Sequence, residues 1–453
     1  MSGPATNPGA RPPRRRAETP RPTQRYDVAV VGNALPGLVA AALLAQRGLR
    51  VLHVAAVGGG TYEAGGFRLP SRPELLPAPK HVPVVRETLE ELALAAPVQR
   101  SLQPAPAQFV LPRARFELDS VECFFGTGAN AALAQLASDA ETLAPLVAAP
   151  PLLPRTLGER LRLWNHARAN RARFLAPLDL GAAAALAEPL LALHRFATAD
   201  RSPPLALGFA RATAPLLQGL HRLPEGGLAA QLVGHVRARR GDALVARVEA
   251  VQLERGHAAG LQIGGELWRA RSVLAALPVP QLLPLLPEGR RTARLRALGE
   301  GARALPLHVR NLVLARDGVP PALGPLAVAT RDGAAALFER RPALRTDGSE
   351  DPAAATITVS SYDEGALDDL IEDVLPFHGP HVLHRSDSPD PGAGVDLAVP
   401  RPNGFEGLPV ATPVPGLFLA GPELLPALGL EGAFLAGRAL AARVQAIAGR
   451  ERP

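Results

Sequence analysis

The run from Tyr26 to Val54, YDVAVVGNALPGLVAAALLAQRGLRVLHV, constrains the fold more than any other part of the chain. Residues Asp27 to Val31 are apolar and rich in valine, which is typical of a strand buried on both faces of a parallel sheet. A turn at residues 32–37 follows, then an alanine- and leucine-rich helix to Arg47 and a second strand from Arg50 to Val54. This order predicts two parallel strands joined by a crossover helix, and therefore an α/β domain.

The turn in this unit keeps part of the G-x-G-x-x-G pattern with which proteins hold a dinucleotide. In that pattern the first glycine makes a tight turn, the second lets the pyrophosphate approach, and the third lets helix and strand pack closely. Gly32 and Gly37 stand at the first and third positions, whereas Ala34 stands at the second. The acid that usually binds the ribose about 20 residues later is missing, because Ala55 lies there and the nearest carboxylate is Glu63. The sequence predicts a dinucleotide-binding fold in which some ligand contacts are replaced.

Composition and charge exclude several classes of protein. The chain has 453 residues, 47% of them hydrophobic, which is enough for one large core or two. The formal net charge is +7, but six arginines lie between Arg11 and Arg25, ahead of the first strand, and Lys80 is the only lysine. No nucleic-acid-binding motif is present, so we expect no nucleic-acid partner. We expect the Pro- and Arg-rich residues 1–25 to be disordered.

Targeting patterns are also missing from the sequence. The N-terminal arginines are not followed by the apolar segment of a signal peptide. No window reaches the roughly 18 uninterrupted apolar residues of a transmembrane helix. We therefore expect a soluble, cytoplasmic protein.

Metal and thiol chemistry receive little support. Cys123, the single cysteine, excludes an intramolecular disulfide and a cysteine-based zinc site, and its apolar surroundings favour a packed core residue. His378, His381 and His384 stand three residues apart, but neighbouring prolines such as Pro380 favour a loop there. We expect no metal site.

A basic segment from Thr156 to Phe174 admits two interpretations. It predicts a helix with five arginines, and Leu157, Leu161 and Trp164 fall on one side of it. An interfacial helix at a membrane surface has this combination of apolar residues and arginines. The favoured interpretation is a solvated helix whose apolar stripe packs on the core. Peripheral membrane contact is left open.

Other elements follow from local patterns. We expect helices at Val84 to Leu94 and at Ala131 to Leu143, the second capped by Asn130, and a hairpin at Gln108 to Leu118. Acidic residues between Asp363 and Asp373 predict an exposed helix.

Four segments in the same order resemble the phytoene desaturase and flavin amine oxidase superfamily of FAD-dependent oxidoreductases. They are DVAVVGNALPGLVAAALLAQRG near the start, HRLPEGGLAAQLVGHV and ARVEAVQLERGHAAGLQIGGELWRARSVLAALP in the middle, and GLFLAGPELLPALGLEGAFLAGRALAARV near the end. The resemblance implies a Rossmann-like FAD/NAD(P)-binding domain with an interleaved α+β substrate domain. The implied parts are a discontinuous FAD-binding domain at 26–75, 215–290 and 410–448, and a substrate domain at 76–214 and 291–409.

The resemblance also implies the residues of a cofactor site. They are Gly32, Ala34, Gly37, Gly59, Gly60, Val248, Gly421, Glu423, Gly432 and Ala433. Val248 would lie against the adenine, and the helix start at Gly432 and Ala433 would face the flavin with its positive dipole end.

Three positions depart from the family's pattern. The family's glutamate after the second strand corresponds to Ala55, and the arginine of its glycine-pair loop is missing after Gly59 and Gly60. The family's Gly-Asp pair near the C-terminus is Gly421-Pro422, with Glu423 as the candidate substitute. Each lost hydrogen bond to a charged group weakens binding by roughly 1.5 to 3 kcal/mol, so FAD affinity is expected to be reduced or lost.

Two functions follow from these patterns. The first is an FAD-dependent oxidoreductase, desaturase- or isomerase-like, acting on an apolar isoprenoid or lipid; NAD(P) in the same fold is a weaker option. Amine oxidases of this superfamily use a lysine near the flavin, and Lys80 lies in the wrong part of the chain. Segments Leu180 to Leu193 and Pro278 to Pro287 are candidates for an apolar tunnel, with plain core the favoured interpretation. No catalytic residue is assigned, because the flavin would carry the chemistry.

The second function is a degenerate, non-catalytic member of the superfamily that binds a lipid or a partner protein. The replacements at Ala34, Ala55 and Pro422, all at expected cofactor contacts, favour it.

Overall fold

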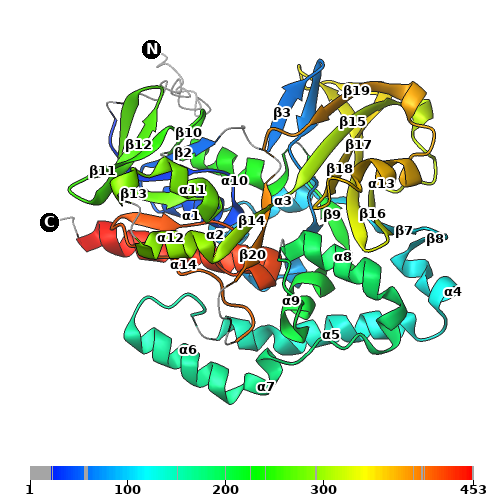
Figure 1. Cartoon of the computed structure of the whole chain (residues 1–453), viewed down its shortest axis with the longest axis horizontal. Coiled ribbons are helices and arrows are strands. Elements are labelled where there is room, and N and C mark those ends of the chain that lie inside the picture. Colours follow the sequence, from blue (N-terminus) through cyan, green and yellow to red (C-terminus); the bar gives the residue numbers. More distant parts are fainter. Residues whose placement is uncertain are drawn as a thin grey trace, which may run out of the picture.

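Two sheets with helices packed against them make up the computed structural model (Figure 1). It describes residue 22 and residues 24–450, apart from 56–59, 150, 199, 225, 240, 291–292, 391, 399–400 and 402. None of the described helices is long and apolar enough to cross a membrane.

The first sheet contains the predicted strand–helix–strand unit. Its parallel strands, in spatial order, are β10 (Gly241–Val245), β2 (Val51–Ala55), β1 (Tyr26–Val31), β13 (Glu266–Ala275) and β21 (Leu417–Leu419). Strand β13 continues antiparallel into β12 (His257–Ile263) and β11 (Ala250–Glu254). Register pairs Val28 with Val51 on one side and with Ser272 on the other. The sheet therefore joins segments far apart in the sequence, as the interleaved arrangement requires.

Three helices cover this sheet. Helix α1 (Leu35–Gln46) packs against α14 (Gly429–Arg450) and α10 (Gly227–Ala238). Every residue of α1 from Pro36 to Ala45 is buried, which explains why its sequence shows no polar face. Helix α2 (Pro83–Glu91) packs on α14 and is followed by α3 (Ala95–Ser101).

The second sheet is mostly antiparallel. Its strands run in the order β19 (Val382–Asp387), β15 (His308–Ala315), β18 (Glu350–Ser361), β17 (Ala334–Arg345), β16 (Leu326–Arg331), β7 (Ala107–Leu111) and β8 (Ala114–Glu117). The predicted hairpin at residues 108–118 is β7–β8. Helix α13 (Leu367–Val374) packs on this sheet and carries the acidic residues predicted on an exposed helix, two of which, Asp368 and Asp373, pair with arginines.

The hairpin of β3 (Thr61–Ala64) and β4 (Phe67–Pro70) differs from the sequence prediction. It lies inside the predicted nucleotide segment 26–75, but β4 pairs with β17 of the second sheet. The chain therefore leaves the first sheet directly after β2, earlier than the proline-rich stretch suggested.

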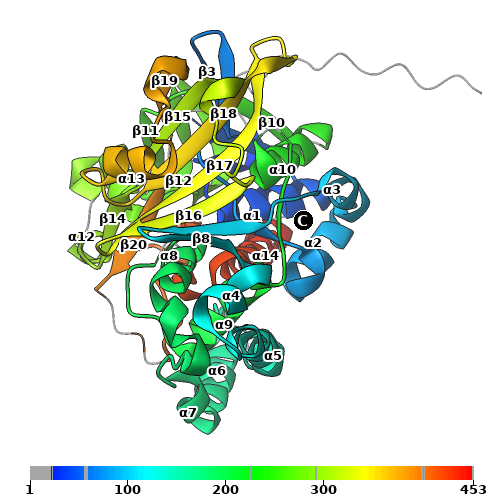
Figure 2. The same ribbon diagram turned by 90° about the vertical axis from the view of Figure 1, so that its right-hand side faces the viewer.

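Helices gather below the second sheet (Figure 2). They are α4 (Val121–Phe125), α5 (Ala129–Ala148), α6 (Leu157–Ala169), α7 (Arg171–Phe174), α8 (Ala187–Thr198) and α9 (Ala206–Leu217). Gly128 caps α5, so the predicted cap Asn130 lies inside the helix. Cys123 is exposed on the short helix α4, so the expectation of a packed core cysteine was wrong.

The apolar stripe of the basic segment also departs from the favoured expectation. The predicted single helix is divided into α6 and α7 at Asn170, and Leu157, Leu161 and Trp164 are exposed rather than packed on the core. The inner side of α6 instead buries Glu159 and Ala167.

Smaller elements complete the fold. They are the pair β14 (Ala302–Pro306) and β20 (Ala393–Leu397), the short strands β5 (Leu76–Pro77), β9 (Leu220–Arg222) and β6 (Gln103–Pro104), and the helices α11 (Val279–Leu282) and α12 (Ala293–Glu300).

Candidate functional site

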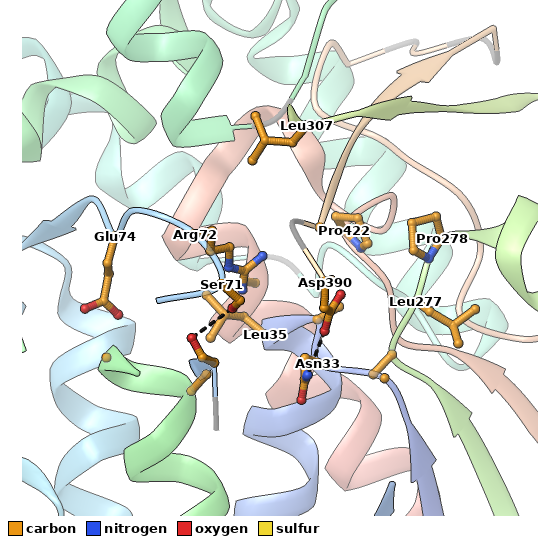
Figure 3. A pocket seen from close by; sticks show the side chains of 18 of the residues that line it. Asn33, Leu35, Ser71, Arg72, Glu74, Leu277, Pro278, Leu307, Asp390 and Pro422 are labelled. Atoms are coloured by element: carbon orange, nitrogen blue, oxygen red, sulfur yellow. Dashed lines mark hydrogen bonds between the residues drawn. The ribbon is translucent and has the colours of Figure 1, made fainter. Parts of the chain in front are cut away.

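A cleft of about 800 Å³ draws its lining from both sheets and from the start of α14. The turn after β1, the end of β2 and the loop around Val248 line it. Arg72, Glu74 and residues of β17 and β18 line it as well. Figure 3 shows Asn33, Glu74 and Pro422, which come from separate segments, around a common space. The volume is in the range of small-molecule and cofactor pockets, so this cleft is the candidate site.

The two retained glycines of the turn are required by the chain's own packing. Gly32 has φ +97°, and a Cβ there would lie 2.3 Å from the carbonyl oxygen of Ala276. A Cβ on Gly37 would lie 2.3 Å from the Cβ of Ala276. Both glycines let the turn and α1 approach the residue that follows β13. Their presence is therefore explained by the fold without reference to a cofactor.

The side chain of His53 contacts the same turn from strand β2. Its Nε2 lies 3.0 Å from the carbonyl oxygen of Gly32, and the side chain is buried in β2. Burial lowers the pKa of His53 to about 4, so the ring is neutral at physiological pH. This contact rigidifies the turn, and the sequence pattern alone did not reveal it.

Ala34, Ala55 and Val248 all line the cleft beside the turn after β1 and the end of β2. Ala34 lines the cleft and its backbone N–H donates to Ala276 over 2.9 Å. Ala55 ends β2 at the cleft, so no carboxylate stands where the ribose would lie. The N–H of Ala246 donates to the carbonyl of Ala55, which holds the loop bearing Val248 beside β2. The predicted neighbours are thus brought together, while their contact with a cofactor stays a prediction.

The glycine-pair loop is only partly described. Gly60 has φ +79° and lines the cleft, and its carbonyl accepts hydrogen bonds from the backbone and the hydroxyl of Ser71. Gly59 lies outside the described residues.

At the C-terminal motif, Pro422, Gly432 and Ala433 line the cleft. Glu423 is not among the lining residues: it is fully buried, and its Oε1 accepts a hydrogen bond of 3.1 Å from the backbone of Val279. Gly421 is needed for this arrangement, because a Cβ there would lie 2.3 Å from Oε2 of Glu423. Burial raises the pKa of Glu423 to about 7. The carboxylate proposed to replace the family's aspartate therefore lies beneath the cleft wall, in the position of a structural group.

A buried ion pair fixes the start of α14. Arg211 on α9 donates through Nε to Glu431 over 2.7 Å and pairs through Nη2 with its other oxygen. Its Nη1 donates to the carbonyl of Ala140 on α5 over 2.7 Å. Because the guanidinium and the carboxylate satisfy each other, this pair holds Gly432 and Ala433 at the edge of the cleft.

The cleft also carries charged residues that sequence reasoning missed. Glu74 accepts a hydrogen bond of 2.7 Å from the N–H of Leu228 in the first turn of α10. Gly227 leaves room for it, since a Cβ there would lie 2.4 Å from the carboxylate. Burial raises the pKa of Glu74, although Leu228 and the charges of Arg341 and Arg72 oppose the shift. The only sequence clue was the glycine pair, which predicted a helix start but not its capping carboxylate.

A second acid lies at the turn itself. The Nδ2 of Asn33 donates to the carboxylate of Asp390 over 3.0 Å, so a loop that follows β19 reaches the turn (Figure 3). The N-terminal end of α1 is the place where a dinucleotide pyrophosphate binds in this type of fold. Asp390 therefore brings a negative charge to the region where an anionic ligand would lie.

The two segments predicted as candidates for an apolar tunnel lie in different parts of the structure. Pro278, Gln281 and Leu285 of the segment 278–287 line the cleft. The described residues of the segment 180–193 do not, and its buried leucines belong to a separate core cluster. Lys80 is exposed and does not line the cleft. Among the described residues no group of three or more His, Cys, Asp or Glu side chains is placed to hold a metal.

No protein-family profile matches the chain. No curated protein sequence matches it. Solved structures do match. An oxidoreductase from Methanosarcina mazei is 15% identical with a TM-score of 0.57, and the alignment covers 92% of this chain and 99% of that one. A putrescine oxidase double mutant is 15% identical with a TM-score of 0.60, covering 93% and 99%.

Cyclohexylamine oxidase from Brevibacterium oxydans is 17% identical with a TM-score of 0.54, covering 94% of this chain and all of that one. At this level of identity the likeness shows the fold. The chain has the fold of these oxidoreductases, with a Rossmann-like nucleotide domain and an interleaved second domain.

Proposed function

We propose that the cleft binds FAD and that the protein is an FAD-dependent oxidoreductase. The observation that carries this proposal is the continuous cleft from the turn after β1 to the start of α14, in a fold similar to that of oxidoreductases over nearly the whole chain. When bound in such a cleft, FAD supplies a hydride acceptor.

The residues of the cleft leave space for FAD but supply few of the polar contacts that usually hold it. The tight turn at Gly32, the wall around Val248 and the helix start at Gly432 supply the space and the dipole end that a dinucleotide needs. The ribose acid is missing at Ala55, and Pro422 offers no side-chain acceptor. We therefore propose binding that is weaker than a complete set of contacts would give.

For the substrate we propose an apolar molecule of the isoprenoid or lipid class in a desaturase- or isomerase-like reaction. Most side chains that line the cleft are apolar, among them Leu285, Leu337 and Leu430, and they exclude water from the space. Burial raises the pKa of Glu74, so its ionised form is less favourable there than in water. No lysine is among the described lining residues, which disfavours the lysine-dependent chemistry that the superfamily resemblance associates with amine oxidation.

A second candidate is a non-catalytic binding protein on the same fold. Two observations favour it: Gly32 and Gly37 are required by packing alone, and the carboxylate of Asp390 lies at the turn where a pyrophosphate would bind. Like charges at this point would oppose the cofactor.

Titration of the purified protein with FAD, followed by flavin absorbance and fluorescence, tests the proposal. We expect saturable binding, and we expect Ala55→Glu to tighten it about 10- to 150-fold because it restores a charged acceptor at the end of β2. Ala55→Gln is the matched control, with the same size and no charge. If neither the natural chain nor Ala55→Glu retains FAD, the oxidoreductase proposal fails; if only Ala55→Glu binds, the non-catalytic candidate is favoured.

A further inference from the structure

The hydrogen bonds of helix α6 come from its capping residues and from His166, away from its exposed apolar side chains. Thr156 accepts a hydrogen bond of 3.2 Å from the N–H of Glu159, whose side chain returns to the backbone of Thr156 and forms an ion pair with Arg155. The ring of His166 lies 3.2 Å from the carbonyl of Leu146 on α5. These contacts satisfy the inner face, so the outer face is not needed to anchor the helix.

The outer face carries an apolar stripe. Leu157, Leu161 and Trp164 are 72%, 53% and 57% exposed. Spacings of four and three residues place all three on the same side of the helix. An isolated exposed leucine requires no explanation, but three large apolar side chains on one short helix form a patch of the kind that marks an interaction site.

Arginines surround this stripe. Arg160, Arg162 and Arg168 on α6 are exposed, as are Arg171 and Arg173 on α7. The guanidinium of Arg168 lies over the ring of Trp164, 5.4 Å from its centre. Within the described part of the chain, none of these five arginines forms an ion pair with a carboxylate. Five positive charges on α6 and α7 are therefore concentrated beside the exposed apolar stripe.

We propose that the outer face of α6 docks the protein on an anionic lipid surface. An interfacial helix inserts Leu and Trp side chains at the headgroup boundary while its arginines contact lipid phosphates, and α6 presents both. Helices α6 and α7 lie at the lower end of the molecule in both views (Figures 1 and 2).

The positive charge of this face favours an anionic lipid surface over a second copy of the chain as its partner. A two-fold contact through this face would bring the arginines of two copies together, and such like-charge contacts are unfavourable. An anionic bilayer instead complements them. An acidic protein partner is the remaining alternative, and the experiment distinguishes it.

Tryptophan fluorescence during titration with vesicles tests the proposal. The chain has two tryptophans, and Trp268 is buried, so a blue shift on binding reports Trp164. We expect the shift with phosphatidylglycerol vesicles and its loss with phosphatidylcholine vesicles or high salt. In Trp164→Phe the shift disappears while co-sedimentation with phosphatidylglycerol vesicles remains.

Six arginines ahead of β1 could also attract anionic lipid, so the decisive comparison is between the full chain and its α6 variants. Replacing Arg160, Arg162 and Arg168 together by Gln should weaken vesicle binding roughly 100-fold, since each arginine near the surface contributes about fivefold. Arg113→Gln, at an exposed position in the β7–β8 turn, is the matched control and should leave binding unchanged.

Three results would overturn the proposal. The first is equal binding to phosphatidylglycerol and phosphatidylcholine vesicles, and the second is unchanged binding of the triple arginine variant. The third is the absence of any vesicle binding. In that case size-exclusion chromatography follows: a dimer that Leu161→Ser disrupts would assign the face to a second copy of the chain. If no such dimer forms, the face would be assigned to a protein partner.

Discussion

Replacing Glu423 by Gln should remove a pH dependence of folding that this carboxyl imposes. The side chain is fully buried, accepts one backbone hydrogen bond, and has no hydrogen-bond partner for Oε2 among the described residues. Burial raises its pKa from 4.5 to about 7. A rise of that size corresponds to about 3 kcal/mol of folding free energy.

The direction of this pH dependence follows from the protonation of Glu423 in the folded and in the unfolded chain. Below pH 4.5 the carboxyl is protonated in both the folded and the unfolded chain, and it imposes no penalty. As pH rises from 4.5 toward 7, the unfolded chain ionises first, so the folded state loses stability. Above that range the full penalty is present.

Urea unfolding at about pH 5 and about pH 8 measures this effect. The free energy of unfolding of Glu423→Gln relative to the natural chain should rise by about 3 kcal/mol from the lower to the higher pH. Taking the difference between the two chains cancels other titrating groups. Glu300→Gln, at an exposed site on α12, should show no such change. A stability difference for Glu423→Gln that stays constant with pH would refute the reasoning.

Three further outcomes are expected from urea unfolding. Glu431→Gln should destabilise the fold by about 3 to 5 kcal/mol because it leaves Arg211 charged and buried, and replacing both residues by apolar ones should cost less than that single change. Gly37→Ala should cost about 1 to 3 kcal/mol through overpacking, whereas Gly234→Ala in α10, where a Cβ meets nothing within 4 Å, should be neutral or stabilising. Because burial lowers the pKa of His53 to about 4, the natural chain should lose stability as pH falls from 6.5 toward 4, and His53→Gln should reduce that loss by up to about 3 kcal/mol.

The sequence predicted the start of the first sheet well because each element there has a local sequence pattern. The valine-rich strand, the glycine turn and the all-apolar helix each have their own pattern. Strands β1 and β2 match the predicted ranges within one residue, whereas α1 begins three residues earlier than predicted, inside the turn. The pairing of β4 with β17 was not predicted, because strand pairing over nearly 280 residues has no local pattern.

The cleft was only partly predictable. Gly32 and Val248 were found from motifs, but Arg72, Glu74 and Asp390 enter it through tertiary placement, which neither spacing nor composition encodes. Periodicity has the same limit on α6: it identified the apolar stripe but not whether that stripe faces inward or outward.

The covering of α1 by α14 determines when the first sheet can become stable during synthesis. Helix α1 has no polar face, and its cover begins at Gly429, almost 400 residues later in the chain. Until the ribosome has released that helix, the early strands and α1 carry an apolar surface with no partner, and such surfaces are prone to aggregation. The packing around α1 is therefore completed late in synthesis, once α14 has left the ribosome, rather than in the first step of folding.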